Sequence, residues 1–138
     1  TVETKGIPLA HATANYLNVP VVIVRRDTKV TEGSVVSINY VSGSSKRIQT
    51  MSLARRVLPE QSKVLIIDDF MKAGGTARGM IDLLKEFKAE VVGIGVLVET
   101  SDVEERLVDD YISLGKITQL DLKDKEIKLE LGNFLSKF

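Results

Sequence analysis

Two adjacent carboxylates stand between an apolar run and a glycine-rich turn. The apolar residues 64–67 are followed by Asp68 and Asp69, and a Gly-Gly-Thr sequence follows at residues 74–76. In a parallel α/β sheet, ligands bind at the carboxyl ends of the strands, where glycine lets backbone N–H groups approach a phosphate and the next helix favours negative charge. The two acids repel a phosphate and instead require hydroxyl groups or a metal ion. This pattern predicts a site that holds a phosphorylated sugar by its diol and its phosphate together.

Other interpretations of this motif are weaker. A nucleoside-triphosphate P-loop needs lysine directly after its glycines, whereas Lys72 precedes them. A receiver domain carries its acid pair in the first strand and a phosphoacceptor aspartate after a later one, but the apolar run 91–98 continues into Glu99 and Thr100. A structural alternative stays open, in which the acids cap the turn and Thr76 caps the next helix. Because capping and phosphate binding coexist at helix ends, that alternative does not exclude a ligand site.

Length and composition describe an ordinary globular domain. The 138 residues are 43% hydrophobic and 28% charged, which suits one domain with a real core. Nineteen basic residues balance nineteen acidic ones, so the whole-chain charge indicates no nucleic-acid or membrane surface. The absence of cysteine excludes disulfides, thiolate zinc sites and cysteine nucleophiles. No long apolar run or secretory signal is present, so we expect a cytoplasmic location.

The apolar spacing predicts alternating strands and helices, which is typical of right-handed βαβ units and a parallel sheet. We expect helices at 7–17, 75–87 and 103–111, and strands at 19–24, 34–41, 48–53, 63–67, 91–98, 117–122 and 127–131. The strands 34–41 and 48–53 are joined by a Ser-Gly turn and should form an antiparallel hairpin. Because this insertion is rich in Ser, Gly, Lys and Arg, we expect a mobile flap beside the ligand rather than core.

These residues resemble a known family. The segment 66–76 (Ile-Ile-Asp-Asp-Phe-Met-Lys-Ala-Gly-Gly-Thr) is similar to the phosphoribosyl-pyrophosphate motif of type I phosphoribosyltransferases. A second match, residues 1–10 with 17–20 and 24–26, looks like the pyrophosphate loop of the purine-type members. The two motifs occur in the family's order, and the resemblance covers essentially the whole chain. It implies a type I phosphoribosyltransferase-like α/β fold, with a parallel sheet flanked by helices and an antiparallel flap hairpin.

The resemblance also implies a role for each motif residue. Asp68 and Asp69 would bind the ribose hydroxyls directly or through Mg²⁺, and Tyr40 would either contact the ligand or only pack across the hairpin. The lysine and arginine residues 25, 46 and 47 could assist from the flap. The full set expected to bind phosphoribosyl pyrophosphate comprises the pyrophosphate loop Thr4, Lys5 and Gly6, the basic residues Arg26 and Lys29, Tyr40, the acids Asp68 and Asp69, and the phosphate loop Phe70, Met71, Lys72, Ala73, Gly74, Gly75 and Thr76.

Two functions remain in competition at this point. Residues 70–73 and 41–54 resemble the purine-biosynthesis repressors of Gram-positive bacteria, regulators built on this fold. That resemblance implies a non-catalytic effector domain at 1–138, a homodimer, and an N-terminal winged-helix domain that binds operator DNA and is missing from this chain, which opens as if a strand had already begun. Phosphoribosyl pyrophosphate would weaken DNA binding, and a guanosine polyphosphate could compete for the same anion sites. The alternative is a catalytic purine-type phosphoribosyltransferase, which the low aromatic content of 5% disfavours because no aromatic hood follows Leu114 to stack a base.

Overall fold

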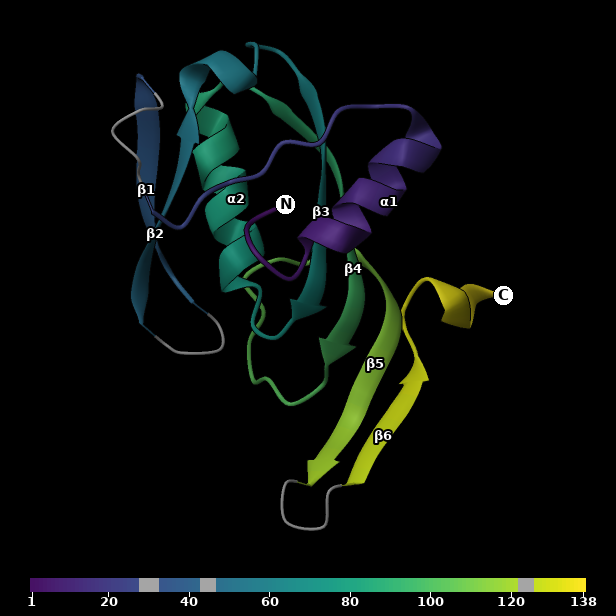
Figure 1. Ribbon diagram of the computed structural model, residues 1–138. Coiled ribbons are helices and arrows are strands. Elements are labelled where there is room, and N and C mark those ends of the chain that lie inside the picture. The colour runs from purple at the N-terminus through teal and green to yellow at the C-terminus, as the bar shows by residue number, and fades with distance from the viewer. Residues whose placement is uncertain (28–32, 43–46, 122–125) are drawn as a thin grey trace.

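The fold is a four-stranded mixed sheet with a separate two-stranded hairpin (Figure 1). The computed structural model describes residues 1–27, 33–42, 47–121 and 126–138. Its elements, in chain order, are α1 (Ile7–Leu17), β1 (Val35–Val41), β2 (Ile48–Ala54), the 3-10 turn η2 (Arg55–Val57), β3 (Lys63–Met71), α2 (Gly75–Glu86), β4 (Glu90–Thr100), β5 (Ile112–Asp121), β6 (Glu126–Leu131) and the 3-10 turn η3 (Leu135–Lys137). No described helix has the length and apolarity needed to cross a membrane.

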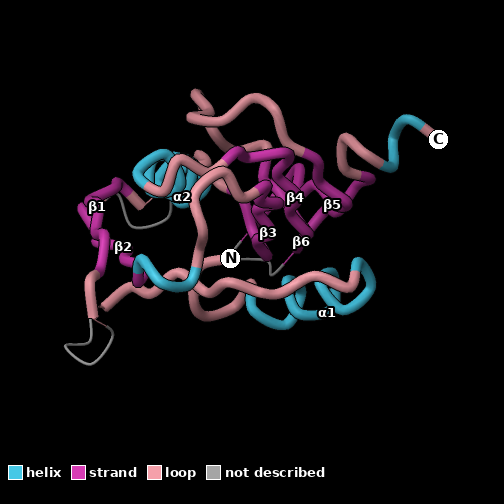
Figure 2. The backbone as a smooth tube through the Cα atoms, turned by 90° about the horizontal axis from the view of Figure 1, so that it is seen from above, coloured by secondary structure: helices cyan, strands magenta, loops and turns pink. Residues whose placement is uncertain are grey.

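The sheet confirms the expected α/β fold. Its strand order is β3-β4-β5-β6; β3, β4 and β5 run parallel, and β6 pairs antiparallel with β5. Helices α1 and α2 lie on opposite sides of this sheet, and the β1–β2 hairpin lies beside α2 (Figure 2). The parallel strands β3 and β4 therefore have the same carboxyl edge, where the β3–α2 turn begins.

The hairpin prediction was right about pairing and wrong about burial. β1 and β2 pair antiparallel as expected, but one face of the hairpin packs on α2 and belongs to the core. Met51 is fully buried, and Tyr40 and Leu53 are nearly so. Helix α2 comes close enough that a Cβ at Gly79 would lie 2.9 Å from Met51 Cε. The apolar residues on one face of each strand therefore bury the hairpin in the core, although its polar composition suggested an exposed flap.

Two predicted elements do not form. Residues 19–24 make no strand: Val24 forms an isolated parallel bridge with Val2, and Arg25 an antiparallel bridge with Ser52. In the described chain, residues 19–24 have only the short segment 1–3 as a parallel partner. A ladder of several paired residues therefore does not form. Residues 103–111 form no helix, because the N–H of Leu107 donates to the Ala73 carbonyl at 2.9 Å, a tertiary partner in another loop. Tertiary anchoring overrides local helix propensity there.

The strand that carries the acids is longer than expected. β3 continues from Lys63 to Met71, and Asp68 pairs in parallel register with Val96 of β4. The acids are thus within the last part of the strand instead of following it. Because side chains alternate across a strand, Asp68 faces the buried side and Asp69 the more open one.

Candidate functional site

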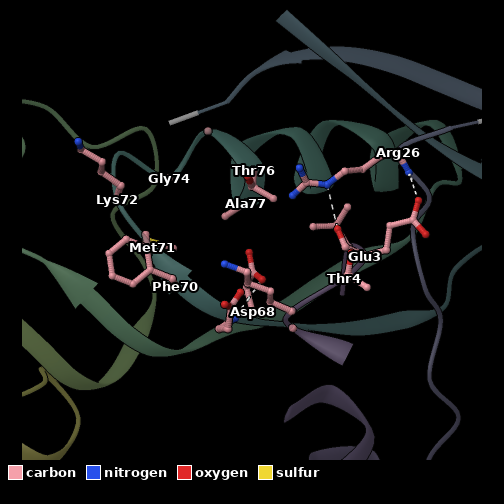
Figure 3. Close-up of a pocket in the computed structure, with 15 residues that line it drawn as sticks. Glu3, Thr4, Arg26, Asp68, Phe70, Met71, Lys72, Gly74, Thr76 and Ala77 are labelled. Atoms are coloured by element: carbon pink, nitrogen blue, oxygen red, sulfur yellow. Dashed lines mark hydrogen bonds between the residues drawn. The ribbon is translucent and has the colours of Figure 1, made fainter. Parts of the chain in front are cut away.

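A cavity of about 580 Å³ opens at the carboxyl end of β3 (Figure 3). Such a volume falls within the usual range for small-molecule sites. Its walls come from the segment before α1, the end of β3, the β3–α2 turn and Arg26. The lining residues are Val2, Glu3, Thr4, Lys5, Gly6, Arg26, Asp68, Asp69, Phe70, Met71, Lys72, Gly74, Gly75, Thr76 and Ala77.

The acid pair lies between two segments that border the cavity, residues 4–6 before α1 and residues 72–76 of the β3–α2 turn. In Figure 3, Asp68 lies between Lys72 on one side and Glu3 and Thr4 on the other. Asp68 is 8% exposed, and its Oδ1 accepts a hydrogen bond from the Asp69 N–H at 3.0 Å. Burial of the carboxylate, reinforced by the neighbouring Asp69, raises the pKa of Asp68 to about 7 despite that hydrogen bond. The sequence predicted a pair of acids that follows the strand, whereas Asp68 is buried within it.

The β3–α2 turn has the backbone of an anion site. Gly74 is the N-cap of α2 with φ +82°, a conformation that favours glycine, and α2 begins at Gly75. The first N–H groups of a helix have no partner within the helix, and they attract a phosphate together with the helix dipole. Thr76 therefore lies inside the first turn, which excludes the alternative that it is the N-cap. Thr76 lines the cavity.

The pyrophosphate loop faces the acids from the other side. The Glu3–Thr4 peptide is cis, and α1 follows directly at Ile7 with Gly6 as its N-cap. A Cβ at Gly6 would lie 2.8 Å from Asp68 Oδ1 and closer still to Thr1 Oγ1, so a larger residue here would force these side chains to shift. The cavity is thus bordered by the N-termini of both α1 and α2, which favour negative charge.

Arg26 is held beside this loop by Glu3. The Arg26 Nε donates to the Glu3 carbonyl at 2.9 Å, and the Arg26 N–H donates to the Glu3 carboxylate at 2.7 Å. This backbone hydrogen bond, with the ion pair to Arg25 at 3.1 Å, lowers the pKa of Glu3. Glu3 was not predicted from the sequence as a site residue. The one feature that could have indicated it is its position immediately before Thr4 of the pyrophosphate loop. The Glu3 carboxylate forms an ion pair with Arg25, and Arg25 does not line the cavity.

Most of the expected binding residues converge on this cavity, and two of those that the structure describes do not line it. Tyr40 is buried in the hairpin, where its hydroxyl donates to Gln49 Oε1 at 2.8 Å, as the packing alternative predicts. Ala73 belongs to the phosphate loop, but its carbonyl faces the 101–111 segment. Lys29 lies outside the described residues, as does Lys46, and Arg47 is exposed away from the cavity lining. Ligand contact by every member of the set stays a prediction.

The donor set suits Mg²⁺ only in partnership with a ligand. No group of three or more acidic, histidine or cysteine side chains suited to a metal occurs among the described residues. Mg²⁺ is commonly held by one or two carboxylates together with phosphate oxygens and water. Asp68 and Asp69, next to the N-termini of α1 and α2, fit that arrangement, and they are the residues that would hold the ion. When bound, Mg²⁺ would neutralise charge between the acids and a pyrophosphate.

The fold and this cavity define a class of protein: an α/β domain with a small-molecule cavity at the carboxyl edge of its parallel strands, bordered by an acid pair and by the N-termini of two helices. The phosphoribosyl transferase domain model matches residues 1–130. The chain belongs to that family.

Relatives of two kinds share this domain. The chain is 68% identical over 138 residues to the purine biosynthesis transcriptional repressor PurR of Bacillus subtilis (strain 168), covering all of this chain and 48% of the relative. It is 47% identical over 136 residues to the purine biosynthesis transcriptional activator PurR of Lactococcus lactis subsp. lactis (strain IL1403), covering 99% of this chain and 50% of the relative. It is also 35% identical over 124 residues to the xanthine phosphoribosyltransferase of Lactococcus lactis subsp. cremoris (strain SK11), covering 88% of this chain and 63% of that enzyme. The chain spans about half the length of the regulators it matches.

The solved structures agree with the fold. The adenine phosphoribosyltransferase of Thermoanaerobacter pseudethanolicus superposes with a TM-score of 0.74 and 25% identity, over 83% of this chain and 67% of that one.

Proposed function

We propose that this chain is the effector-binding domain of a transcriptional regulator of purine biosynthesis genes, and that its cavity binds phosphoribosyl pyrophosphate. One observation supports the ligand proposal: the N-termini of two helices flank an acid pair in a single cavity. A ligand with a phosphate at one end, a pyrophosphate at the other and a diol between them matches that order. The 5′-phosphate would bind residues 72–76, the ribose hydroxyls Asp68 and Asp69, and the pyrophosphate residues 4–6 with Arg26.

The regulatory role is supported by the relatives. The relative that is 68% identical is named a repressor and is about twice as long as this chain. We therefore propose a homodimeric cytoplasmic protein in which an N-terminal winged-helix domain binds operator DNA. Ligand binding would weaken that interaction, because an effector shifts an equilibrium only through different affinities for two states. A 47% identical relative is named an activator, so the sign of the transcriptional effect needs its own measurement.

A guanosine polyphosphate is proposed as a competitor for the same cavity. Backbone N–H groups at a helix N-terminus, as at residues 4–6, recognise a pyrophosphate without contacting the rest of the molecule. Competition would appear as displacement of phosphoribosyl pyrophosphate by the guanosine polyphosphate but not by guanosine. Failure to displace would remove the competitor and leave the effector proposal intact.

A catalytic purine-type phosphoribosyltransferase is the second candidate. It is favoured by the 35% identity to a xanthine phosphoribosyltransferase. An enzyme must stabilise the transition state beyond the bound substrate, whereas a sensor needs only ligand affinity. The cavity is compatible with both catalysis and ligand sensing, so a functional assay must distinguish them.

One pair of assays on the full-length protein separates these functions. Operator DNA binding is measured by fluorescence anisotropy with and without phosphoribosyl pyrophosphate and Mg²⁺, and pyrophosphate release is measured with a panel of purine and pyrimidine bases. We expect a ligand-dependent loss of DNA affinity and no base-dependent turnover. Turnover without a DNA response would establish the enzyme instead.

A further inference from the structure

The loop between β4 and β5 contacts the β3–α2 turn through Arg106 and Leu107. In Figure 1 the segment 101–111 passes beside the β3–α2 turn. Arg106 donates to the Lys72 carbonyl at 2.9 Å and to the Thr100 carbonyl at 2.6 Å, and it forms an ion pair with Glu99 at 2.8 Å. The guanidinium carbon also lies 5.4 Å from the centre of the Tyr111 ring. None of residues 101–111 lines the cavity.

The contacts of this segment set the direction of two peptide groups in the turn. The Lys72 carbonyl accepts from Arg106, and the Ala73 carbonyl accepts from the Leu107 N–H at 2.9 Å. In a trans peptide the N–H points opposite to the carbonyl. The N–H groups of Ala73 and Gly74 therefore point away from segment 101–111, and Gly74 lines the cavity whereas no residue of that segment does. Successive N–H groups aimed to one side form the concavity that binds an anion.

Glu99 keeps Arg106 in place. Its side chain is 7% exposed and accepts hydrogen bonds from Ser113 Oγ at 2.6 Å and from the Tyr111 hydroxyl at 2.5 Å. Burial acts to raise the pKa of Glu99, but these hydrogen bonds and the charge of Arg106 outweigh it, so the pKa lies below its usual value. Glu99 is therefore ionised at neutral pH and holds a charged, hydrogen-bonded arginine beneath the turn.

We infer that Arg106, anchored by Glu99, is a positioning residue that aims the backbone of the β3–α2 turn at the phosphate of the ligand. The inference rests on the proposed function, because it assigns a role in binding phosphoribosyl pyrophosphate. It concerns only the phosphate half of the site, since the pyrophosphate loop at residues 4–6 is held by other contacts.

The test compares two probes on the 138-residue chain. Ribose 5-phosphate reports on the β3–α2 turn, and inorganic pyrophosphate reports on residues 4–6 and Arg26. Arg106→Lys keeps the charge but cannot contact the Lys72 carbonyl, the Thr100 carbonyl and Glu99 in one planar geometry. We expect at least tenfold weaker binding of ribose 5-phosphate and unchanged binding of pyrophosphate.

The matched control is Arg78→Lys. Arg78 is exposed on α2 and pairs only with Asp82 there in the contacts the structure describes, at 3.1 Å. This control should bind both probes as the wild type does. In ¹H–¹⁵N spectra, the amide shifts of Ala73 and Gly74 should move in Arg106→Lys while that of Gly6 stays in place.

Each outcome has a distinct meaning. If Arg106→Lys does not fold, Glu99→Gln provides the same comparison, because it keeps the side-chain shape and removes the charge that anchors Arg106. Equal ribose 5-phosphate affinity in a folded variant would overturn the inference, as would an equal loss for both probes, which indicates general damage. If the wild type binds neither probe nor phosphoribosyl pyrophosphate, the proposed function itself fails.

Discussion

Replacing Asp68 by asparagine should stabilise the folded chain while removing a ligand group. Burial raises the pKa of Asp68 from 3.8 to about 7, and the adjacent Asp69 adds to that rise. A pKa difference of roughly three pH units, at about 1.4 kcal/mol each, corresponds to about 4 kcal/mol of unfolding free energy. Asparagine has nearly the same shape and no charge to desolvate, so it avoids this cost.

The sign of the effect follows from proton binding. Between pH 3.8 and 7 the folded chain retains a proton on Asp68 that the unfolded chain has released. Unfolding free energy therefore falls as pH rises through this window and levels off above about 7. The stability of Asp68→Asn relative to the wild type should rise over the same window, reaching about 4 kcal/mol above pH 7.

Urea denaturation from pH 4.5 to 8.5, with EDTA present to remove divalent cations, measures this difference. Taking the difference between the variant and the wild type cancels the contributions of other titrating groups, including Glu3, Asp82 and Glu99, whose pKa values are lowered. Asp69→Asn is the comparison variant: it keeps Asp68 buried and removes only the adjacent charge, so it should show a smaller pH-dependent difference. A pH-independent difference for Asp68→Asn, or one no larger than for Asp69→Asn, would refute the reasoning.

Two further substitutions test the turn and the hairpin. Gly74→Ala should lower the unfolding free energy by about 1–2 kcal/mol, because φ at this residue is +82°. The added Cβ would lie at an ordinary 3.6 Å from Val108, so the cost comes from the backbone conformation and not from a clash. Chemical denaturation measures the difference, and an unchanged midpoint would mean that the turn relaxes. Tyr40→Phe removes the hydrogen bond to Gln49 and should cost about 1 kcal/mol. Its affinity for phosphoribosyl pyrophosphate by calorimetry should equal that of the wild type, and a tenfold loss would restore Tyr40 as a ligand contact.

Local sequence signals identified the central elements of the fold. Pro8 in the first turn and the apolar spacing located α1, and Ala77, Met80 and Leu84 marked the buried face of α2. The β-branched run before the acids located β3, although the strand continues to Met71 because β4 offers pairing partners as far as Glu99. That continuation, which buries Asp68, depends on a neighbour distant in sequence.

The missed features are those set by long-range contacts. Residues 19–24 carry a β-branched strand pattern, yet a strand needs a partner, and the described chain offers only the segment 1–3. Residues 103–111 carry a helical pattern, but Arg106 and Leu107 are bonded to the β3–α2 turn. The acid pair and glycine turn were recognisable because all their parts lie in one short segment. Glu3, Glu99 and Arg106 act through contacts that no local spacing reveals.

The most direct test of the central claim is isothermal titration of the chain with phosphoribosyl pyrophosphate and Mg²⁺ at pH 8. The wild type should bind at one site per chain. Because a hydrogen bond to a charged group is worth about 1.5–3 kcal/mol, the double variant Asp68→Asn/Asp69→Asn should bind at least about a hundredfold more weakly while remaining folded. Undiminished binding by the folded double variant, or no binding by the wild type, would contradict the account.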